Sequence, residues 1–458
     1  MQIYSAFALL PDGWRNDVLV TTDAAGDINR VQAQAGGRDA DVRVGLLLPG
    51  IANLHSHAFQ RAMSGLAEVA GPGEDSFWTW RRLMYRFVER LTPDDIEAIA
   101  AQLYLELLRH GYTSVAEFHY LHHDPGGHRY NEAGELSLRC IAAARQTGIA
   151  ITHLPVLYAH SGFGGVRPDK AQRRFVNDVD ALLAMVDSLA AHFPADPDVR
   201  IGAAAHSLRA VKPEQLTQLH DGLYALDAGA PLHLHIAEQT REVEDCLAWS
   251  GARPVRWLLD NHAVDEHWCL IHATHVTDEE LRSMAASGAV VGLCPTTEAN
   301  LGDGIFPASD YQRHAGAFGI GSDSHVSTSP VEELRWLEYG QRLLHQRRNL
   351  LAGGARRSTG STLFETAVRG GAQALARPAG AIAAGKRADL VALDSRHVAL
   401  AGRDCEQCVD AWLFAGNDSP VSDVFVGGRH VVANGWHRQA ETIGQRYRDT
   451  LGRLLEDL

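Results

Sequence analysis

Eight short apolar runs divide the middle of this 458-residue chain. Between them lie segments whose apolar residues are spaced three or four apart and which end at glycine, such as residues 93–111 and 278–288. Alternation of strand and helix repeated eight times predicts a parallel (β/α)₈ TIM barrel, in which functional groups lie at the carboxyl ends of the strands. The runs are residues 46–57, 113–120, 149–160, 199–210, 230–238, 267–276, 289–301 and 318–326.

Strand-like patterns return on both sides of this region. Short apolar runs broken by Asp, Gly and Asn fill residues 1–48, and the stretches "GKRADLVALD", "VDAWLFAG" and "VSDVFVGGRHVVANG" follow residue 380. We therefore expect an α/β chain with two domains. Residues 49–380 would form a distorted barrel, and the segments 1–48 and 381–458 would pair into a small β-sandwich domain.

Charge and composition exclude several classes of partner. The net charge is −14 and no long Lys/Arg run occurs, which argues against nucleic acid or an anionic membrane. No apolar run reaches the roughly 18 residues of a membrane span, and the first residues lack the pattern of a secretory signal. The six cysteines are scattered, and we interpret the pair Cys405 and Cys408 as unrelated thiols. A cytoplasmic location is expected.

Histidines and an aspartate end three of the predicted strands. With 24 histidines in the chain, roughly one His-x-His pair arises by chance, so the pair His55 and His57 means little alone. Its placement matters more, because residues i and i+2 of a strand share a face and both can point to the barrel axis. His235 lies near the end of the fifth run and Asp323 near the end of the eighth. Three imidazoles and a carboxylate suit a catalytic Zn²⁺ with an open position for water, although iron or manganese would also accept them.

The neighbours of these four residues indicate hydrolysis of a C–N bond. Glu238, three residues beyond His235, is predicted to shuttle a proton from water to a leaving nitrogen. His272 ends the sixth run and is predicted to anchor the attacked group, while Asp323 could also accept the proton of water. The fourth run contains no lysine that could bridge two metals, which favours a single ion.

Several segments resemble a known superfamily over nearly the whole chain. "PGIANLHSHAF", "HIAE", "GSDSH" and "GKRADLVALD" are similar to the single-zinc deaminases of the amidohydrolase superfamily. The longer strings "NLHSHAFQRAMSGLAE", "SFWTWRRLMYR", "AEFHYLHHD", "HSLRAV", "TTEANLGDGIFP" and "SDSHVSTSPVEELRWLEYGQRL" resemble the formimidoylglutamate deiminase family. This resemblance implies conversion of N-formimino-L-glutamate and water to N-formyl-L-glutamate and ammonia, in histidine degradation.

The resemblance also implies roles for particular residues. It implies the metal ligands His55, His57, His235 and Asp323, the catalytic pair Glu238 and His272, and the substrate contacts Gln60, Arg81, Tyr120 and Arg209. His206, near the rim at the end of the fourth run, is added as a further substrate contact because of its position. Arginine forks bind carboxylates in a bidentate manner, which suits a dicarboxylate substrate. Arg82 could take the place of its neighbour Arg81, and the sequence leaves this open. A homodimer is expected.

Two alternatives differ in class. Another single-zinc deaminase would act on a purine such as guanine, and its pocket would need amide or aromatic contacts to a flat ring. A non-catalytic scaffold would have lost metal ligands, and none is lost here.

Overall fold

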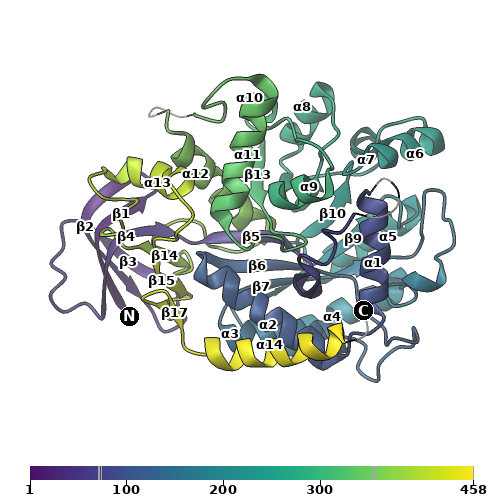
Figure 1. Cartoon of the computed structure of the whole chain (residues 1–458), viewed down its shortest axis with the longest axis horizontal. Helices are drawn as coiled ribbons and strands as arrows, with labels where there is room; N and C mark the ends of the chain where they lie inside the picture. The colour runs from purple at the N-terminus through teal and green to yellow at the C-terminus, as the bar shows by residue number, and fades with distance from the viewer. Residues whose placement is uncertain (71–72, 74, 354–356, 457–458) are drawn as a thin grey trace.

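A closed parallel barrel forms the centre of the computed structural model, which describes residues 1–70, 73, 75–353 and 357–456 (Figure 1). Neighbouring strands pair in the order β6-β5-β13-β12-β11-β10-β9-β7-β8, and a further β6–β7 pairing closes the ring. Gly202 splits the fourth strand into β8 and β9, so the barrel has eight strand positions. The strands are β5 (Ile51–Ser56), β6 (Tyr112–His119), β7 (Ala150–Leu157), β8 (Val199–Ile201), β9 (Ala203–Ser207), β10 (Leu232–Ile236), β11 (Trp268–His272), β12 (Val290–Leu293) and β13 (Ala317–Ile320). The predicted fold class is confirmed.

Helices surround this barrel, and two further helices lie in its carboxyl-end loops. The helix α2 begins at Pro93, where Thr92 and Asp95 form a reciprocal capping box. The outer helices are α2 (Pro93–Arg109), α3 (Glu135–Thr147), α4 (Val179–His192), α5 (Pro213–Leu226), α6 (Thr240–Ser250), α7 (Pro254–Asn261), α8 (Asp278–Ser287), α10 (Ala308–Arg313), α11 (Pro330–His345) and α12 (Thr359–Ala374). The loop helices are α1 (Phe77–Val88) and α9 (Pro295–Leu301).

The two terminal segments share a second sheet beside the barrel. Its order is β17-β16-β15-β14-β4-β1-β2-β3, so strands from both ends of the chain meet at the β14–β4 pairing, where Leu390 lies opposite Pro49. These strands are β1 (Gln2–Leu10), β2 (Gly13–Thr22), β3 (Ile28–Gln32), β4 (Val42–Pro49), β14 (Leu390–Leu393), β15 (Val421–Val426), β16 (Arg429–Ala433) and β17 (Trp436–His437). The predicted pairing of the terminal segments is confirmed.

The chain crosses from this sheet to the barrel at Gly50. The predicted run 46–57 therefore belongs to two strands, β4 and β5, in two different sheets. A side chain at position 50 would meet Thr113, since an ideal Cβ there lies 2.3 Å from the Thr113 side chain. The Gly50 amide donates to the Asp389 carbonyl at 2.8 Å, which ties the crossing to the C-terminal segment.

The C-terminal segment also forms two helices, α13 (Cys405–Phe414) and α14 (Ala440–Leu455). Prediction of a strand at "VDAWLFAG" is therefore wrong, because Asp404 caps a helix whose Val409, Trp412 and Leu413 are buried together. The helix α14 lies along α2 of the barrel layer (Figure 1). The predicted domain boundaries at residues 48/49 and 380/381 stay a prediction.

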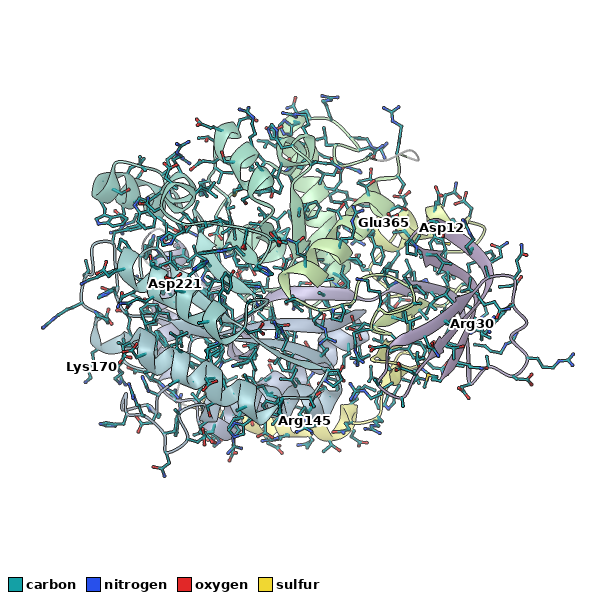
Figure 2. All side chains as sticks on the ribbon, turned by 180° about the vertical axis from the view of Figure 1, so that it is seen from behind. Asp12, Arg30, Arg145, Lys170, Asp221 and Glu365 are labelled. Atoms are coloured by element: carbon teal, nitrogen blue, oxygen red, sulfur yellow. The ribbon has the colours of Figure 1, made fainter. Side chains whose placement is uncertain are left out.

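Charged side chains cover the outside of both parts. Lys170 and Asp221 on the barrel side and Arg30 on the terminal sheet are exposed and stand on the outer surface (Figure 2). Within the described ranges, none of the helices has the length and apolar character needed to span a membrane.

Candidate metal centre and active site

Strained backbone concentrates where three barrel strands end. Ala237, His272, Ala273, Asp323 and His325 have φ angles of 51°, 68°, 48°, 45° and 60°. Non-glycine residues seldom adopt the left-handed region, which costs on the order of 1–3 kcal/mol each and persists where surrounding structure enforces it. The surrounding structure therefore holds the backbone at the carboxyl ends of β10, β11 and β13 in an unfavourable conformation. Such backbone strain is common at catalytic and ligand-binding sites.

The four predicted ligands converge at this rim. The Nε2 atoms of His55 and His235 lie 2.9 Å apart. Asp323 Oδ1 lies 3.5 Å from His55 Nε2 and 3.3 Å from His57 Nε2. All four side chains are buried. Residues separated by as many as 268 positions therefore present one nitrogen or oxygen each to a common point.

Hydrogen bonds on the outer ring nitrogens make this donor set suitable for a cation. His57 Nδ1 donates to the Phe118 carbonyl at 2.8 Å, and His235 Nδ1 donates to the His206 carbonyl at 2.8 Å. Because these Nδ1 atoms carry the protons, the Nε2 lone pairs face the common point. Burial lowers the pKa of His55, His57 and His235, which keeps the rings neutral. Neutral imidazoles and a carboxylate are the donors that a divalent metal binds.

A buried carboxylate, Glu117 on β6, holds the His-x-His segment in place. Its Oε2 accepts from Ser56 Oγ at 2.6 Å and its Oε1 accepts from the Ala58 amide at 2.8 Å. Burial raises the pKa of Glu117 to about 7, despite these hydrogen bonds. Sequence reasoning missed Glu117, although a charged residue inside the apolar run 113–120 was a signal that could have found it.

The imidazole of His325 joins the two strands that carry ligands. Ser56 Oγ lies 3.2 Å from His325 Nε2, and Ser322 Oγ lies 2.9 Å from His325 Nδ1. Backbone hydrogen bonds run alongside, from the Asp323 amide to the His55 carbonyl at 3.0 Å and from the His57 amide to the Asp323 carbonyl at 3.2 Å. The ends of β5 and β13 are therefore locked in one register.

Glu238 and His272 lie next to this centre. His272 Nε2 is 3.8 Å from Asp323 Oδ2 and 4.0 Å from Glu238 Oε1. Burial alone lowers the pKa of His272, but Glu238, a hydrogen bond to Glu298 and Asp323 together raise this pKa to about 10. Burial raises the pKa of Glu238 to about 7, against the opposing charges of His272 and Arg209. Glu298 on α9, 3.3 Å from His272 Nδ1, was not predicted from the sequence.

A cavity extends from this centre toward α1. It is lined by all five predicted substrate contacts, Gln60, Arg81, Tyr120, His206 and Arg209, and by aromatic residues including Phe77, Trp80, Tyr85, Tyr158 and Phe175. Gln60 Nε2 donates to the Tyr120 hydroxyl at 2.9 Å. Arg82 is exposed and is not among the lining residues.

Two of the lining arginines lie over one indole ring. The guanidinium carbons of Arg81 and Arg209 are 5.3 Å and 5.7 Å from the centre of the Trp78 ring. Arg209 is buried, and its Nε has no hydrogen-bond partner among the described residues. Burial lowers the pKa of Arg209, but the negative charges of Glu242 and Glu238 have the larger combined effect and raise this pKa above its usual value. Arg209 therefore stays charged. A buried guanidinium with an unused donor is suited to an anion.

Comparison with known proteins agrees with this geometry. A sequence profile of the amidohydrolase family matches residues 46–431. The chain belongs to the amidohydrolase family. It is 52% identical to a formimidoylglutamate deiminase of Pseudomonas aeruginosa, over 99% of both chains.

Solved structures of other proteins share the fold. An amidohydrolase from Brucella melitensis superposes with a TM-score of 0.94 at 46% identity and 99% coverage of both chains. An adenosine deaminase from Xanthomonas campestris, with bound zinc, superposes with a TM-score of 0.81 at 21% identity, covering 99% of this chain and 98% of that one. Family membership and the converging donors support a metal in this amidohydrolase.

Other histidines of the rim and barrel face elsewhere. His233 Nε2 donates to the Ala374 carbonyl at 2.8 Å, away from the metal donors. His275 lies 2.8 Å from the Asp303 carbonyl and does not line the cavity. Of the predicted catalytic and binding residues, the structure brings all to one cavity or its floor, and their roles stay predictions.

Proposed function

We propose that this amidohydrolase converts N-formimino-L-glutamate and water to N-formyl-L-glutamate and ammonia, a reaction of histidine degradation. The observation that carries the proposal is that Arg81 and Arg209 line the same cavity as the metal donors His57, His235 and Asp323. A substrate with carboxylates at one end and an amidine at the other fits that arrangement. The relative from Pseudomonas aeruginosa, named for this reaction, supports it.

His55, His57, His235 and Asp323 are proposed to hold one Zn²⁺. When bound, zinc supplies a polarised water whose pKa falls to about 7. The ring nitrogens that bond to the carbonyls of Phe118 and His206 fix the tautomers that such binding needs.

Proton movements are proposed to use three side chains. Asp323 accepts a proton from the water, whose oxygen adds to the formimino carbon. His272, with its pKa at about 10, stays protonated and donates from Nε2 to that oxygen. Glu238, with its pKa at about 7, relays the proton from Asp323 to the imine nitrogen, which becomes an amino group on a carbon that now carries a hydroxyl. The hydroxyl proton, the second proton of the former water, then passes through Asp323 to the same nitrogen. The bond between that nitrogen and the formimino carbon breaks, ammonia leaves, and the carbonyl of the formyl product forms.

The outer wall of the cavity is proposed to bind the glutamate part. Arg209 and Arg81 would each donate two hydrogen bonds to a substrate carboxylate. The hydrogen-bonded pair Gln60 and Tyr120, together with His206, would orient the formimino group above the floor. Two guanidinium groups in so small a space favour a dicarboxylate over a neutral purine.

Ammonia release from N-formimino-L-glutamate by the purified, zinc-loaded protein tests this proposal, with guanine as a parallel substrate. Turnover of the formimino acid alone is expected. Turnover of guanine alone would support the proposed hydrolytic metal site and refute the proposed contacts between the arginines and the substrate. Metal analysis of the same preparation checks the proposed single zinc ion. The homodimer and the cytoplasmic location remain predictions from the sequence.

A further inference from the structure

A buried glutamate to which the proposed reaction gives no role is bonded to the backbone of Glu238. Glu242 lies in the first turn of α6 and its side chain is fully buried. Its Oε1 accepts from the Ala237 amide at 3.1 Å, and its Oε2 accepts from the Glu238 amide at 3.3 Å. Hydrogen bonds to a charged acceptor are stronger than those to a neutral one. Both oxygens of Glu242 therefore hold the turn that carries Glu238.

Other hydrogen bonds hold the same turn, which joins β10 to α6. The Ala273 amide donates to the Ile236 carbonyl at 3.0 Å, and the His275 amide donates to the Ala237 carbonyl at 3.0 Å. Ala237 has a φ angle of 51°, a left-handed conformation that surrounding contacts must maintain in a non-glycine residue. Ala237 is thus fixed at its amide by Glu242 and at its carbonyl by the loop after β11.

A glutamate at the same position of another helix forms a different set of bonds. Glu280, the third residue of α8, accepts from the amide of the N-cap residue Thr277 at 2.8 Å, and the Thr277 hydroxyl accepts from the Glu280 amide at 3.3 Å. This arrangement is a capping box. Glu242 is the third residue of α6, but its carboxylate bonds to the amides one and two residues before the N-cap residue Gln239. Glu280 therefore caps its helix, whereas Glu242 holds the residues that precede its helix.

We propose that Glu242 is a positioning residue, which holds Glu238 in the geometry that proton transfer requires. The side chain of Glu238 extends from the turn that Glu242 fixes, and its Oε1 lies 4.0 Å from His272 Nε2. A displacement of about 1 Å can cost about 100-fold in rate. Glu242 is not one of the described residues that line the cavity, so it acts through Glu238 and not on the substrate. The inference rests on the proposed function, which assigns the proton transfer to Glu238.

Substrate binding is expected not to need Glu242. Burial lowers the pKa of Arg209, and the charge of Glu242 makes the largest contribution that raises it. Glu242 thus attracts the same guanidinium that a substrate carboxylate would attract. Removing this charge leaves the substrate with one competitor fewer, so KM should not rise when kcat falls.

Steady-state kinetics of Glu242→Gln with N-formimino-L-glutamate test the proposal. An amide keeps the size of the side chain but accepts through one atom only, so one backbone amide loses its acceptor. We expect kcat to fall by about 10-fold to 100-fold, with no rise in KM and with the metal content of the wild type. Glu242→Asp, whose carboxylate is one carbon shorter, should also lower kcat, and circular dichroism checks that both variants are folded. Wild-type kcat in either folded variant would overturn the proposal.

Glu280→Gln is the matched control for the loss of a buried glutamate in the first turn of a helix. Glu280 is 4% exposed and holds the start of α8, away from the turn of Glu238. Its kcat should equal that of the wild type. A fall in kcat as large as that of Glu242→Gln would show a general effect of helix stability and would refute a positioning role.

A double-mutant cycle shows whether Glu242 acts through Glu238. Residues that act as a unit have non-additive effects, so adding Glu242→Gln to Glu238→Gln should lower kcat no further. A further fall as large as that in the wild-type background would mean that Glu242 acts elsewhere, and the proposal would be wrong.

Amide hydrogen exchange gives a readout that needs no substrate. Exchange at the Ala237 and Glu238 amides, followed by NMR or by mass spectrometry of this segment, should be at least about tenfold faster in Glu242→Gln than in the wild type. Equal exchange would overturn the proposal. A wild type that releases no ammonia from N-formimino-L-glutamate would instead refute the proposed function, and the exchange rates would still decide whether Glu242 holds Glu238.

Discussion

The floor of the cavity and its outer wall are built in different ways. The metal donors and catalytic groups on the floor come from the carboxyl ends of barrel strands, and several are tied by further hydrogen bonds, as His57 is to the Phe118 carbonyl and His272 is to Glu298. The outer wall includes α1, which belongs to a loop, and there Arg81 and Arg209 rest mainly on the ring of Trp78.

This difference separates chemistry from recognition. A floor held by buried hydrogen bonds and strained backbone keeps its donors within the narrow geometry that a metal and a proton transfer require. A wall of aromatic and guanidinium contacts depends less on the barrel, so related barrels can change the substrate there. We therefore expect changes to the floor to reduce metal binding or kcat, and changes to the wall to raise KM.

Asp323→Ala should have the largest effect. Removing the only carboxylate among the four converging donors should abolish metal binding and activity together, which metal analysis and ammonia release would measure. His233→Asn is the matched control, because His233 lies on the same strand as His235 but bonds to the Ala374 carbonyl. Full metal content in Asp323→Ala would exclude Asp323 as a ligand.

Glu238→Gln should separate metal binding from turnover. The amide keeps the size of the side chain but cannot carry a proton, so kcat should fall by about 10²–10⁴-fold. Metal content should stay equal to that of the wild type, since Glu238 is not among the four converging donors. Turnover close to that of the wild type would show that another group moves the proton.

The two kinds of residue also differ in how far the sequence predicts them. The eight strand–helix units and the floor residues follow from local patterns, because strand ends of a parallel barrel always meet at one rim. Glu117 and Glu298 could not be placed in this way. Their partners Ser56 and His272 lie 61 and 26 positions away, and only the packing of strands and loops brings them together.

Local patterns also failed where one run serves two structures. Apolar residues stand on both sides of Gly50 in run 46–57, so periodicity does not reveal the change of sheet. In "VDAWLFAG" the apolar residues suit a strand or a buried helix, and the cap at Asp404 decides for the helix. The choice between Arg81 and Arg82 needed the direction of α1 relative to the barrel.

Arg209→Met should raise KM for N-formimino-L-glutamate by about 100-fold, because an unpaired substrate carboxylate in a buried site costs several kcal/mol. kcat should change much less. Arg241→Met is a suitable control, since Arg241 also lies over Trp78, at 5.1 Å, without lining the cavity. An unchanged KM would remove Arg209 from the carboxylate site.

Ser56→Ala tests whether the second layer of the floor matters. The substitution removes the hydroxyl that Glu117 and His325 share, and metal affinity should fall by about 10-fold to 100-fold, as is usual for groups behind metal ligands. Ser114→Ala provides a control. Ser114 is also buried in the barrel wall, but it lies near the start of β6, whereas Glu117 lies near the end of that strand. Equal metal affinities for the two variants would mean that the ligand strands hold their register without this hydroxyl.

The smallest expected difference lies between two neighbours on the outer wall. Arg81 lines the cavity and rests on Trp78 and Tyr85, whereas Arg82 is exposed and turned away. Arg81 is only half-buried, so water screens its charge, and Arg81→Met should raise KM by about tenfold, less than Arg209→Met. Arg82→Met should leave KM unchanged. If Arg82→Met raised KM instead, α1 would have to rotate about its axis on substrate binding so that Arg82 faces the cavity. The outer wall would then be more mobile than the aromatic contacts of Arg81 indicate.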